Sequence, residues 1–191
     1  MEWMNTYIEA ILEDIRISTP YILLIWAAFS AVLLILSCIK ARHILSNAMR
    51  KEYGVWRLEL LCIWIAVILG ITIFGRGEML QEQRFELVPF WSYCAVWREG
   101  NMGLAIQIVL NVVFFVPLGF ALPLCFDYFR SIWRTVAVSA VFSAIIELIQ
   151  GVFAIGLCEF DDVFHNTLGA LVGYGLFLLC RRFYEAAFGK R

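Results

Sequence analysis

Charged residues are scarce in this chain, and their scarcity excludes most classes of soluble protein. Asp, Glu, Lys and Arg make up 16% of the 191 residues, whereas 62% are hydrophobic and the mean hydropathy is +0.82. A typical soluble domain is about one quarter charged and about half apolar. A single core of this size cannot hide so much apolar surface, so the excess requires lipid as its solvent.

Clustered basic residues and metal-binding motifs are also lacking. The net charge is −1, and a nucleic-acid-binding protein would need a strongly basic face, so we expect no nucleic-acid partner. Six cysteines and two histidines form no C-x-x-C pair and no spacing typical of metal ligands. We therefore expect no metal and no other cofactor. The hydrolase signatures HExxH and G-x-S-x-G are missing as well.

Long apolar runs dominate the rest of the sequence and predict an all-α membrane protein. A transmembrane helix needs about 20 mostly apolar residues, and five segments meet this requirement. We therefore expect a polytopic bundle of about five transmembrane helices within residues 20–191. The predicted spans are Pro20–Ile39, Leu58–Phe74, Met102–Phe126, Thr135–Ala154 and Val163–Cys180.

The basic residues are unevenly distributed between the two sides of such a bundle. With five spans, all but four of the 15 Lys and Arg residues lie on the same side as the C-terminus. The exceptions are Arg16, Arg76, Arg84 and Arg98. Cytoplasmic loops of membrane proteins carry an excess of Lys and Arg. The distribution predicts an outward N-terminus, a cytoplasmic C-terminus and an outward-facing acidic loop at Ile155–Asp162.

Two segments outside the spans have recognisable patterns. Residues 1–19 carry apolar residues at three-and-four spacing with acidic residues between them. This is typical of an amphipathic helix at the membrane surface or against other helices. Gly75–Asn101 is the longest connection and is rich in aromatic residues, as in the headgroup belt of membrane proteins. Pro89 should interrupt any helix there, so we expect a loop followed by a short surface or re-entrant element.

Three polar side chains lie deep within the predicted spans, where lipid does not explain them. Glu147 lies about 12 Å below the outer end of its span, and a carboxylate at that depth must be neutral, paired or hydrated. Gln150 follows one turn later on the same face, and Asn111 of the third span is a candidate partner at similar depth. These residues predict either a site for an ion, proton or lipid headgroup, or hydrogen bonds that hold helices together.

The third predicted span also carries helix-breaking residues: Pro117, Gly119 and Pro123. We expect them to interrupt the helix and to kink it near Phe114–Pro117. Carbonyl groups freed at that depth must find donors on neighbouring helices or water. A kink beside Asn111 favours a cavity there.

The outer connection Ile155–Asp162 contains three carboxylates and no basic residue. Asp161 and Asp162 directly precede the last span, and Asn166 shares a helix face with Asp162. Such carboxylates can cap a helix, but they can also bind a cation, act as acid and base, or attract a cationic group. The polar residues of the second half are predicted to line one outward-facing cleft: Asn111, Glu147, Gln150, Asp161, Asp162 and Asn166.

Two smaller features concern packing at the same side. Gly169 and Gly173 continue the face of the last span as a G-x-x-x-G surface, against which another helix can pack closely. Cys94 and Cys158 both fall on the outer side, where a disulfide between them is an open alternative.

Three segments form a pattern that can be compared with known families. They are Leu87–Phe90 (LVPF), Asn111–Phe120 (NVVFFVPLGF) and Asp161–Tyr174 (DDVFHNTLGALVGY). Together with Glu147 and Gln150, they resemble the VanZ-like family of bacterial membrane proteins over residues 55–180. The resemblance implies a multi-pass protein of the bacterial plasma membrane. The family's namesake is associated with resistance to the glycopeptide antibiotic teicoplanin.

The chain departs from the family pattern just before the paired acids. Many members have an arginine and a further aspartate there, whereas this chain has Gly156–Phe160, in which Glu159 takes the acidic place. A mechanism that requires the arginine does not carry over to this chain.

Three functions are compatible with these observations. The first is a non-enzymatic envelope protein that contacts membrane lipids and binds or shields a lipid-linked wall component or a glycopeptide at the polar cleft. The second is a membrane-embedded enzyme acting on a lipid or lipid-linked substrate, with Asp161 or Asp162 as acid, base or ligand. The third is a small ion- or proton-coupled transporter that uses Glu147. We rank them in this order.

Overall fold

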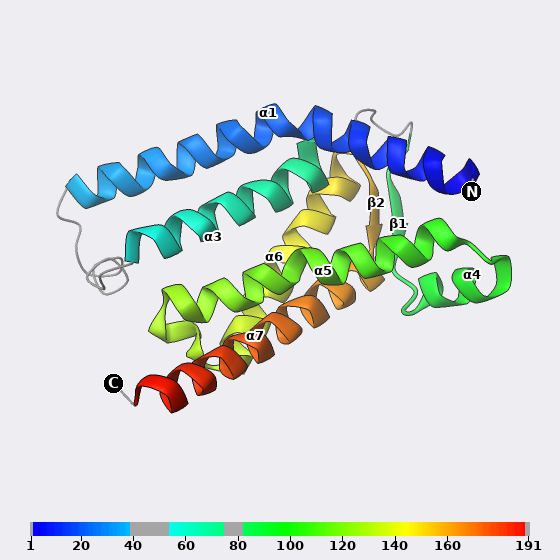
Figure 1. Cartoon of the computed structure of the whole chain (residues 1–191). Coiled ribbons are helices and arrows are strands. Elements are labelled where there is room, and N and C mark those ends of the chain that lie inside the picture. The colour runs from blue at the N-terminus through cyan, green and yellow to red at the C-terminus, as the bar shows by residue number, and fades with distance from the viewer. Residues whose placement is uncertain (1, 39–53, 75–81, 190–191) are drawn as a thin grey trace.

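The computed structural model describes residues 2–38, 54–74 and 82–189, most of which are helical (Figure 1). The elements are α1 (Glu2–Cys38), α3 (Gly54–Leu69), the π-helix η1 (Gly70–Phe74), β1 (Arg84–Glu86), α4 (Trp91–Glu99), α5 (Met102–Cys125), the 3-10 helix η2 (Asp127–Arg130), α6 (Ile132–Val152), β2 (Leu157–Glu159) and α7 (Phe160–Phe188). The predicted all-α class is confirmed, with two short strands in addition.

Four segments of the described chain are long and apolar enough to cross a membrane. They are Trp56–Phe74 in α3 and η1, and the helices α5, α6 and α7. The predicted polytopic bundle and four of its five spans are thereby confirmed. The span predicted at Pro20–Ile39 belongs to α1, whose described apolar stretch is Ile15–Ser30. The rest of that predicted span has side chains outside the described residues.

Helix α1 is continuous from Glu2 to Cys38. The surface helix predicted for residues 1–19 and the span predicted after it are therefore parts of one helix. Figure 1 shows this helix lying along α3. Trp26 Nε1 and Ser30 Oγ of α1 donate to the Glu59 carboxylate of α3, at 3.2 and 2.7 Å, so a polar contact ties the two helices together.

Helices α5 and α7 run in parallel, and glycines allow their backbones to approach closely. An added Cβ at Gly169 would collide with the carbonyl oxygen of Val112, and one at Gly173 with that of Val116. Small residues at such positions let helices pack with little space between their axes. Gly169 and Gly173 thus make the close contact expected of a G-x-x-x-G surface.

Helix α5 is continuous from Met102 to Cys125, so the predicted interruption is wrong, whereas the kink near Phe114–Pro117 stays a prediction. It contains all three residues expected to break it: Pro117, Gly119 and Pro123. Gly119 serves a packing role instead, because it lies against the backbone carbonyl of Ala170 in α7. The indole of Trp64 in α3 donates to the carbonyl of Phe114 at 2.8 Å. A neighbouring helix thus contacts the backbone in the turn that Pro117 weakens.

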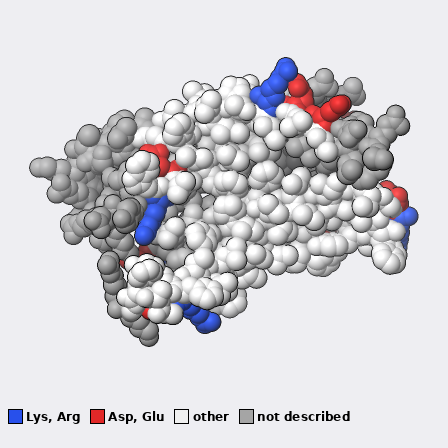
Figure 2. Space-filling model, in the orientation of Figure 1, with Lys and Arg blue, Asp and Glu red and all other residues white. Residues whose placement is uncertain are grey.

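The apolar core lies between α3, α5 and α6. It consists of Leu58, Leu61, Ile68, Phe115, Leu118, Leu122, Cys125 and Ile146. Large apolar side chains are also exposed along the spanning helices, among them Val113, Val141 and Leu179. On the face seen in Figure 2, charged side chains gather toward the two ends, with an uncharged band between them. A soluble protein rarely exposes so much apolar surface, so the arrangement is that of a membrane protein.

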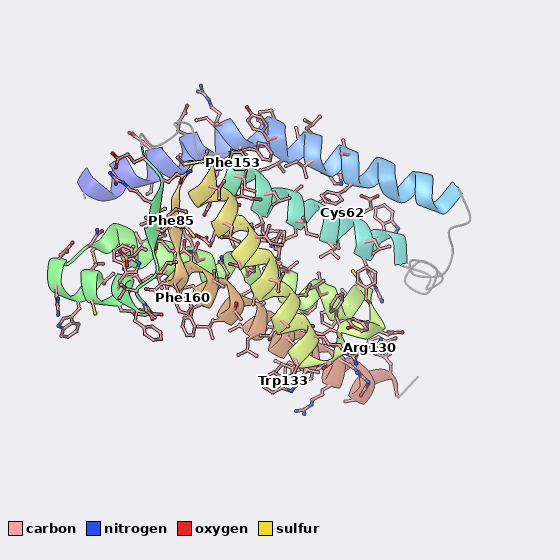
Figure 3. The ribbon with its side chains drawn as sticks, turned by 180° about the vertical axis from the view of Figure 1, so that it is seen from behind. Cys62, Phe85, Arg130, Trp133, Phe153 and Phe160 are labelled. Carbon is pink, nitrogen blue, oxygen red and sulfur yellow. The ribbon has the colours of Figure 1, made fainter. Side chains whose placement is uncertain are left out.

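Two short strands connect distant loops at one end of the bundle. β1 and β2 pair in parallel with Phe85 opposite Cys158, and Gly151 of α6 lies against both side chains. Strands of three residues are too short to show an alternating pattern, so the sequence did not predict them. Figure 3 shows Phe85, Phe153 and Phe160 at this end, whereas Arg130 and Trp133 lie at the other.

Candidate functional site

The carboxylate of Asp161 joins the start of α7 to the start of α4. Its Oδ1 accepts the Phe90 N–H at 2.6 Å, and its Oδ2 accepts the N–H of Ser92 at 3.0 Å and the hydroxyl of Ser92. The side chain is fully buried, and a buried carboxylate needs such charge-assisted bonds. The positive end of the α4 dipole adds to them. Asp161 therefore acts as a clamp that fixes α4 on the bundle.

The Leu87–Phe90 segment leads into α4 through a tight turn. Phe90 has φ 64° and ψ 18°, in the left-handed region that bulky residues rarely adopt. Proline followed by a residue with positive φ is the pattern of a type II turn, and the Trp91 N–H reaches the Val88 carbonyl at 3.4 Å. Pro89 thus forms the turn that starts α4. The bond from Phe90 to Asp161 compensates for part of the backbone strain.

A stripe of buried polar residues runs along α6, with one member in every turn. They are Thr135, Ser139, Ser143, Glu147 and Gln150. Ser143 accepts a bond from the Asn166 amide in α7 at 2.8 Å, and the Gln150 amide donates to the Thr72 carbonyl in η1 at 2.8 Å. Of these five residues, only Glu147 and Gln150 are among those predicted from the sequence. The hydroxyl residues could have been found, because they continue the same face at four-residue spacing.

Glu147 holds the end of β2 rather than a partner in α5. Its Oε2 accepts the backbone N–H of Glu159 at 2.9 Å, and both side chains are buried. The predicted partner Asn111 is not bonded to it: among the described residues, Nδ2 of Asn111 is buried and has no hydrogen-bond partner. The expected pairing of Asn111 with Glu147 is therefore wrong, because Glu147 reaches the strand that follows its own helix.

His165 and Tyr93 form a second link between α7 and α4. His165 Nε2 lies 2.8 Å from the Tyr93 hydroxyl, and its Nδ1 lies 4.0 Å from Oδ1 of Asp162, beyond hydrogen-bond distance. Burial raises the pKa of Tyr93, and the negative charge of Asp161 raises it further. The phenol therefore stays protonated at neutral pH and can donate to His165. Tyr93 is thus held in place by a fully buried side chain.

A groove of about 530 Å³ opens beside α4 and α5. It is lined by Tyr93, Cys94, Val96, Trp97, Arg98 and Ile108. Trp97 is 90% exposed, and Tyr93 is also exposed. The groove therefore presents aromatic and aliphatic surface together with one guanidinium and one phenol. Within the described residues, no group of three or more His, Cys, Asp or Glu side chains could hold a metal ion.

Most of the residues expected to line a cleft lie inside the protein. Five are at most 5% exposed: Glu147, Gln150, Asp161, Asp162 and Asn166. Asp161, Glu147 and Gln150 hold α4, β2 and η1 to the bundle, respectively. Asn166 bonds Ser143 of α6, and Nδ2 of Asn111 takes part in none of these hydrogen bonds. Cys94 and Cys158 are both free thiols, so the open alternative of a disulfide is not realised.

The same region of the chain is the one that known proteins share. The sequence profile of the VanZ/LLP1 family matches residues 58–181, from α3 to the second half of α7. The chain belongs to the VanZ family. Protein VanZ of Enterococcus faecium is 33% identical over 129 residues, which cover 64% of this chain and 74% of that protein. No solved structure matches. The VanZ-like region contains the Asp161 clamp and the α4 groove.

Proposed function

We propose that this VanZ-family protein lowers susceptibility to glycopeptide antibiotics by binding an amphiphile in the α4 groove, either a lipid-linked cell-wall component or the glycopeptide itself. Membership of the VanZ family supports the link to glycopeptides. The observation that carries the proposal is the attachment of α4. A short aromatic helix is held by a buried carboxylate and a buried histidine, and its exposed face borders a groove.

The groove has the chemistry that an amphiphile needs. An apolar or aromatic part of the ligand can pack against Tyr93, Trp97 and Ile108. Arg98 offers a guanidinium, which suits a phosphate or carboxylate in the polar portion. A lipid-linked cell-wall component and a glycopeptide both combine such portions. Rigid attachment of α4 lowers the entropic cost of binding.

Binding is favoured over catalysis by what the acidic residues do. Asp161, one of the two candidates for an acid or base, has both oxygens occupied by Phe90 and Ser92. Glu147 accepts a backbone N–H of β2. Carboxylates in these roles stabilise the fold around the groove. The residues that face the groove carry no carboxylate.

The test compares two exposed tryptophans at opposite ends of the bundle. Trp97 borders the groove, whereas Trp133 is 80% exposed near Arg130 at the other end (Figure 3). Trp97→Ala should abolish the protection that the wild-type protein gives cells against teicoplanin, and Trp133→Ala should keep it. The minimal inhibitory concentration is the readout, with membrane levels of each variant matched by immunoblot.

Two results would argue against the proposal. Full protection by Trp97→Ala would show that the groove is not needed for the function, and equal loss in both variants would indicate a general defect.

Binding of labelled teicoplanin to the purified protein then distinguishes the two possible ligands. Saturable binding that Trp97→Ala weakens identifies the glycopeptide, whereas protection without such binding identifies the lipid-linked component.

A further inference from the structure

A second concave site lies at the end of the bundle opposite α4. It is a pocket of about 370 Å³ bordered by α3, α5, η2 and α7. Its residues include three apolar side chains, Phe120, Leu124 and Phe177, and three arginines, Arg57, Arg130 and Arg181. The arginines come from three different elements, and Figure 3 shows Arg130 at this end. The fold therefore gathers positive charge over an apolar wall.

The positive charge of the pocket is only partly neutralised. Arg181 pairs with Glu185 at 2.7 Å, and Arg130 pairs with Asp127 at 2.9 Å. Arg57 donates to the Leu124 carbonyl at 3.5 Å and has no carboxylate partner among the described residues. Glu185 is the one acidic residue among the pocket's lining residues. Two of the three guanidinium groups thus have a carboxylate partner, and that of Arg57 has none among the described residues.

Contacts on the backbone hold the rim in place. The Tyr174 hydroxyl of α7 donates to the carbonyl of Arg130, and the Thr135 hydroxyl of α6 donates to that of Phe129 at 2.6 Å. The thiol of Cys125 contacts the carbonyl of Arg57 at 3.2 Å. The backbone of Arg57 and that of Arg130 are therefore held in place by contacts from neighbouring helices.

We propose that this pocket binds the phosphodiester headgroup of an anionic phospholipid. Guanidinium groups match phosphate oxygens in geometry and charge, and basic pockets between transmembrane helices bind such headgroups. The acyl chains would continue along the exposed apolar side chains of α7, such as Leu176, Leu179 and Phe183. This apolar continuation distinguishes a lipid from a soluble phosphate, which would gain nothing from it.

The experiment measures lipid binding to the purified full-length protein by native mass spectrometry. Phosphatidylglycerol and phosphatidylcholine with identical acyl chains are titrated against wild type and the double variant Arg57→Gln/Arg181→Gln. Arg16→Gln serves as a control for the loss of a positive charge elsewhere, because Arg16 is highly exposed on α1 and lies outside the pocket. Arg57→Lys keeps the charge and tests whether positive charge alone suffices.

Wild type should retain phosphatidylglycerol several-fold better than phosphatidylcholine. The double variant should lose this preference, whereas Arg16→Gln and Arg57→Lys should keep most of it. Equal retention of the two lipids by wild type, or an unchanged preference in the double variant, would overturn the proposal. Competition by glycerol 1-phosphate at the same concentration as the lipid would also overturn it, since the site would then recognise a soluble phosphate. Gel filtration confirms that each variant remains folded.

Discussion

The two ends of the bundle use carboxylates in opposite ways. At the α4 end, Asp161 and Glu147 are buried and accept backbone N–H groups from other elements. At the arginine end, Asp127 and Glu185 pair with arginines three or four residues away on the helix surface. The first pair determines where α4 and β2 lie. The second pair partly neutralises the arginines at the rim of a pocket.

This difference predicts opposite sensitivities to mutation. Removing a buried hydrogen-bonded carboxylate leaves its backbone donors without partners, and each costs free energy. Removing an exposed carboxylate lets water take its place, so little is lost. Stability should therefore depend on acidic residues at the α4 end. Charge at the arginine end remains available for a ligand.

The largest effect is expected from Asp161→Ala. The variant loses three hydrogen bonds to Phe90 and Ser92 and leaves buried donors unpaired. The free energy of unfolding should fall by about 3 kcal/mol. Titration with SDS in mixed micelles, followed by circular dichroism, measures the change.

Asp127→Ala is the matched control at the other end. Its carboxylate is 61% exposed and pairs with Arg130 at the surface, so its loss should cost at most about 1 kcal/mol. Similar losses in the two variants would contradict the comparison between the ends. A larger loss for Asp127→Ala would reverse it.

A smaller loss of stability is expected from a substitution at the contact between α5 and α7, which connect the two ends of the bundle. A Cβ at Gly173 would collide with the Val116 carbonyl, whereas one at Gly175 has nothing within 4 Å. Gly173→Ala should therefore lower the free energy of unfolding by about 1–3 kcal/mol. Gly175→Ala should leave it unchanged or raise it by about 1 kcal/mol, because alanine favours the helix. Equal responses to the two substitutions would show that the helices do not approach as closely as described.

Much of the fold could be predicted because membrane spans are signalled by long apolar runs. The predicted spans end within three residues of the ends of α5 and α6, whereas the last predicted span stops at Cys180 and α7 continues to Phe188. The interruption of α5 was wrongly predicted because proline removes one bond, and neighbouring helices can supply packing and donors around it. The two strands were not predicted because their pairing joins segments about 70 residues apart in the sequence.

The candidate site could be predicted only in part. A carboxylate deep within an apolar span singles out Glu147, and three carboxylates without a basic residue single out the connection that contains Asp161 and Asp162. Their partners were missed because they are mostly backbone N–H groups, which every residue except proline carries. Only the folded chain brings the N–H groups of Phe90 and Ser92 to Asp161.

The last prediction concerns the reactivity of two thiols at the α4 end, Cys94 and Cys158, and involves no change in stability. Cys94 is exposed on α4, whereas Cys158 is buried in β2. Burial raises the pKa of Cys158, and the charges of Glu147 and Glu159 raise it further, so little reactive thiolate forms at neutral pH. In single-cysteine variants, a membrane-impermeant maleimide should label Cys94 on intact cells, and Cys158 only after denaturation. Comparable labelling of native Cys158 would contradict its burial. Labelling of Cys94 that requires permeabilised cells would place the α4 end in the cytoplasm and reverse the orientation predicted from the basic residues.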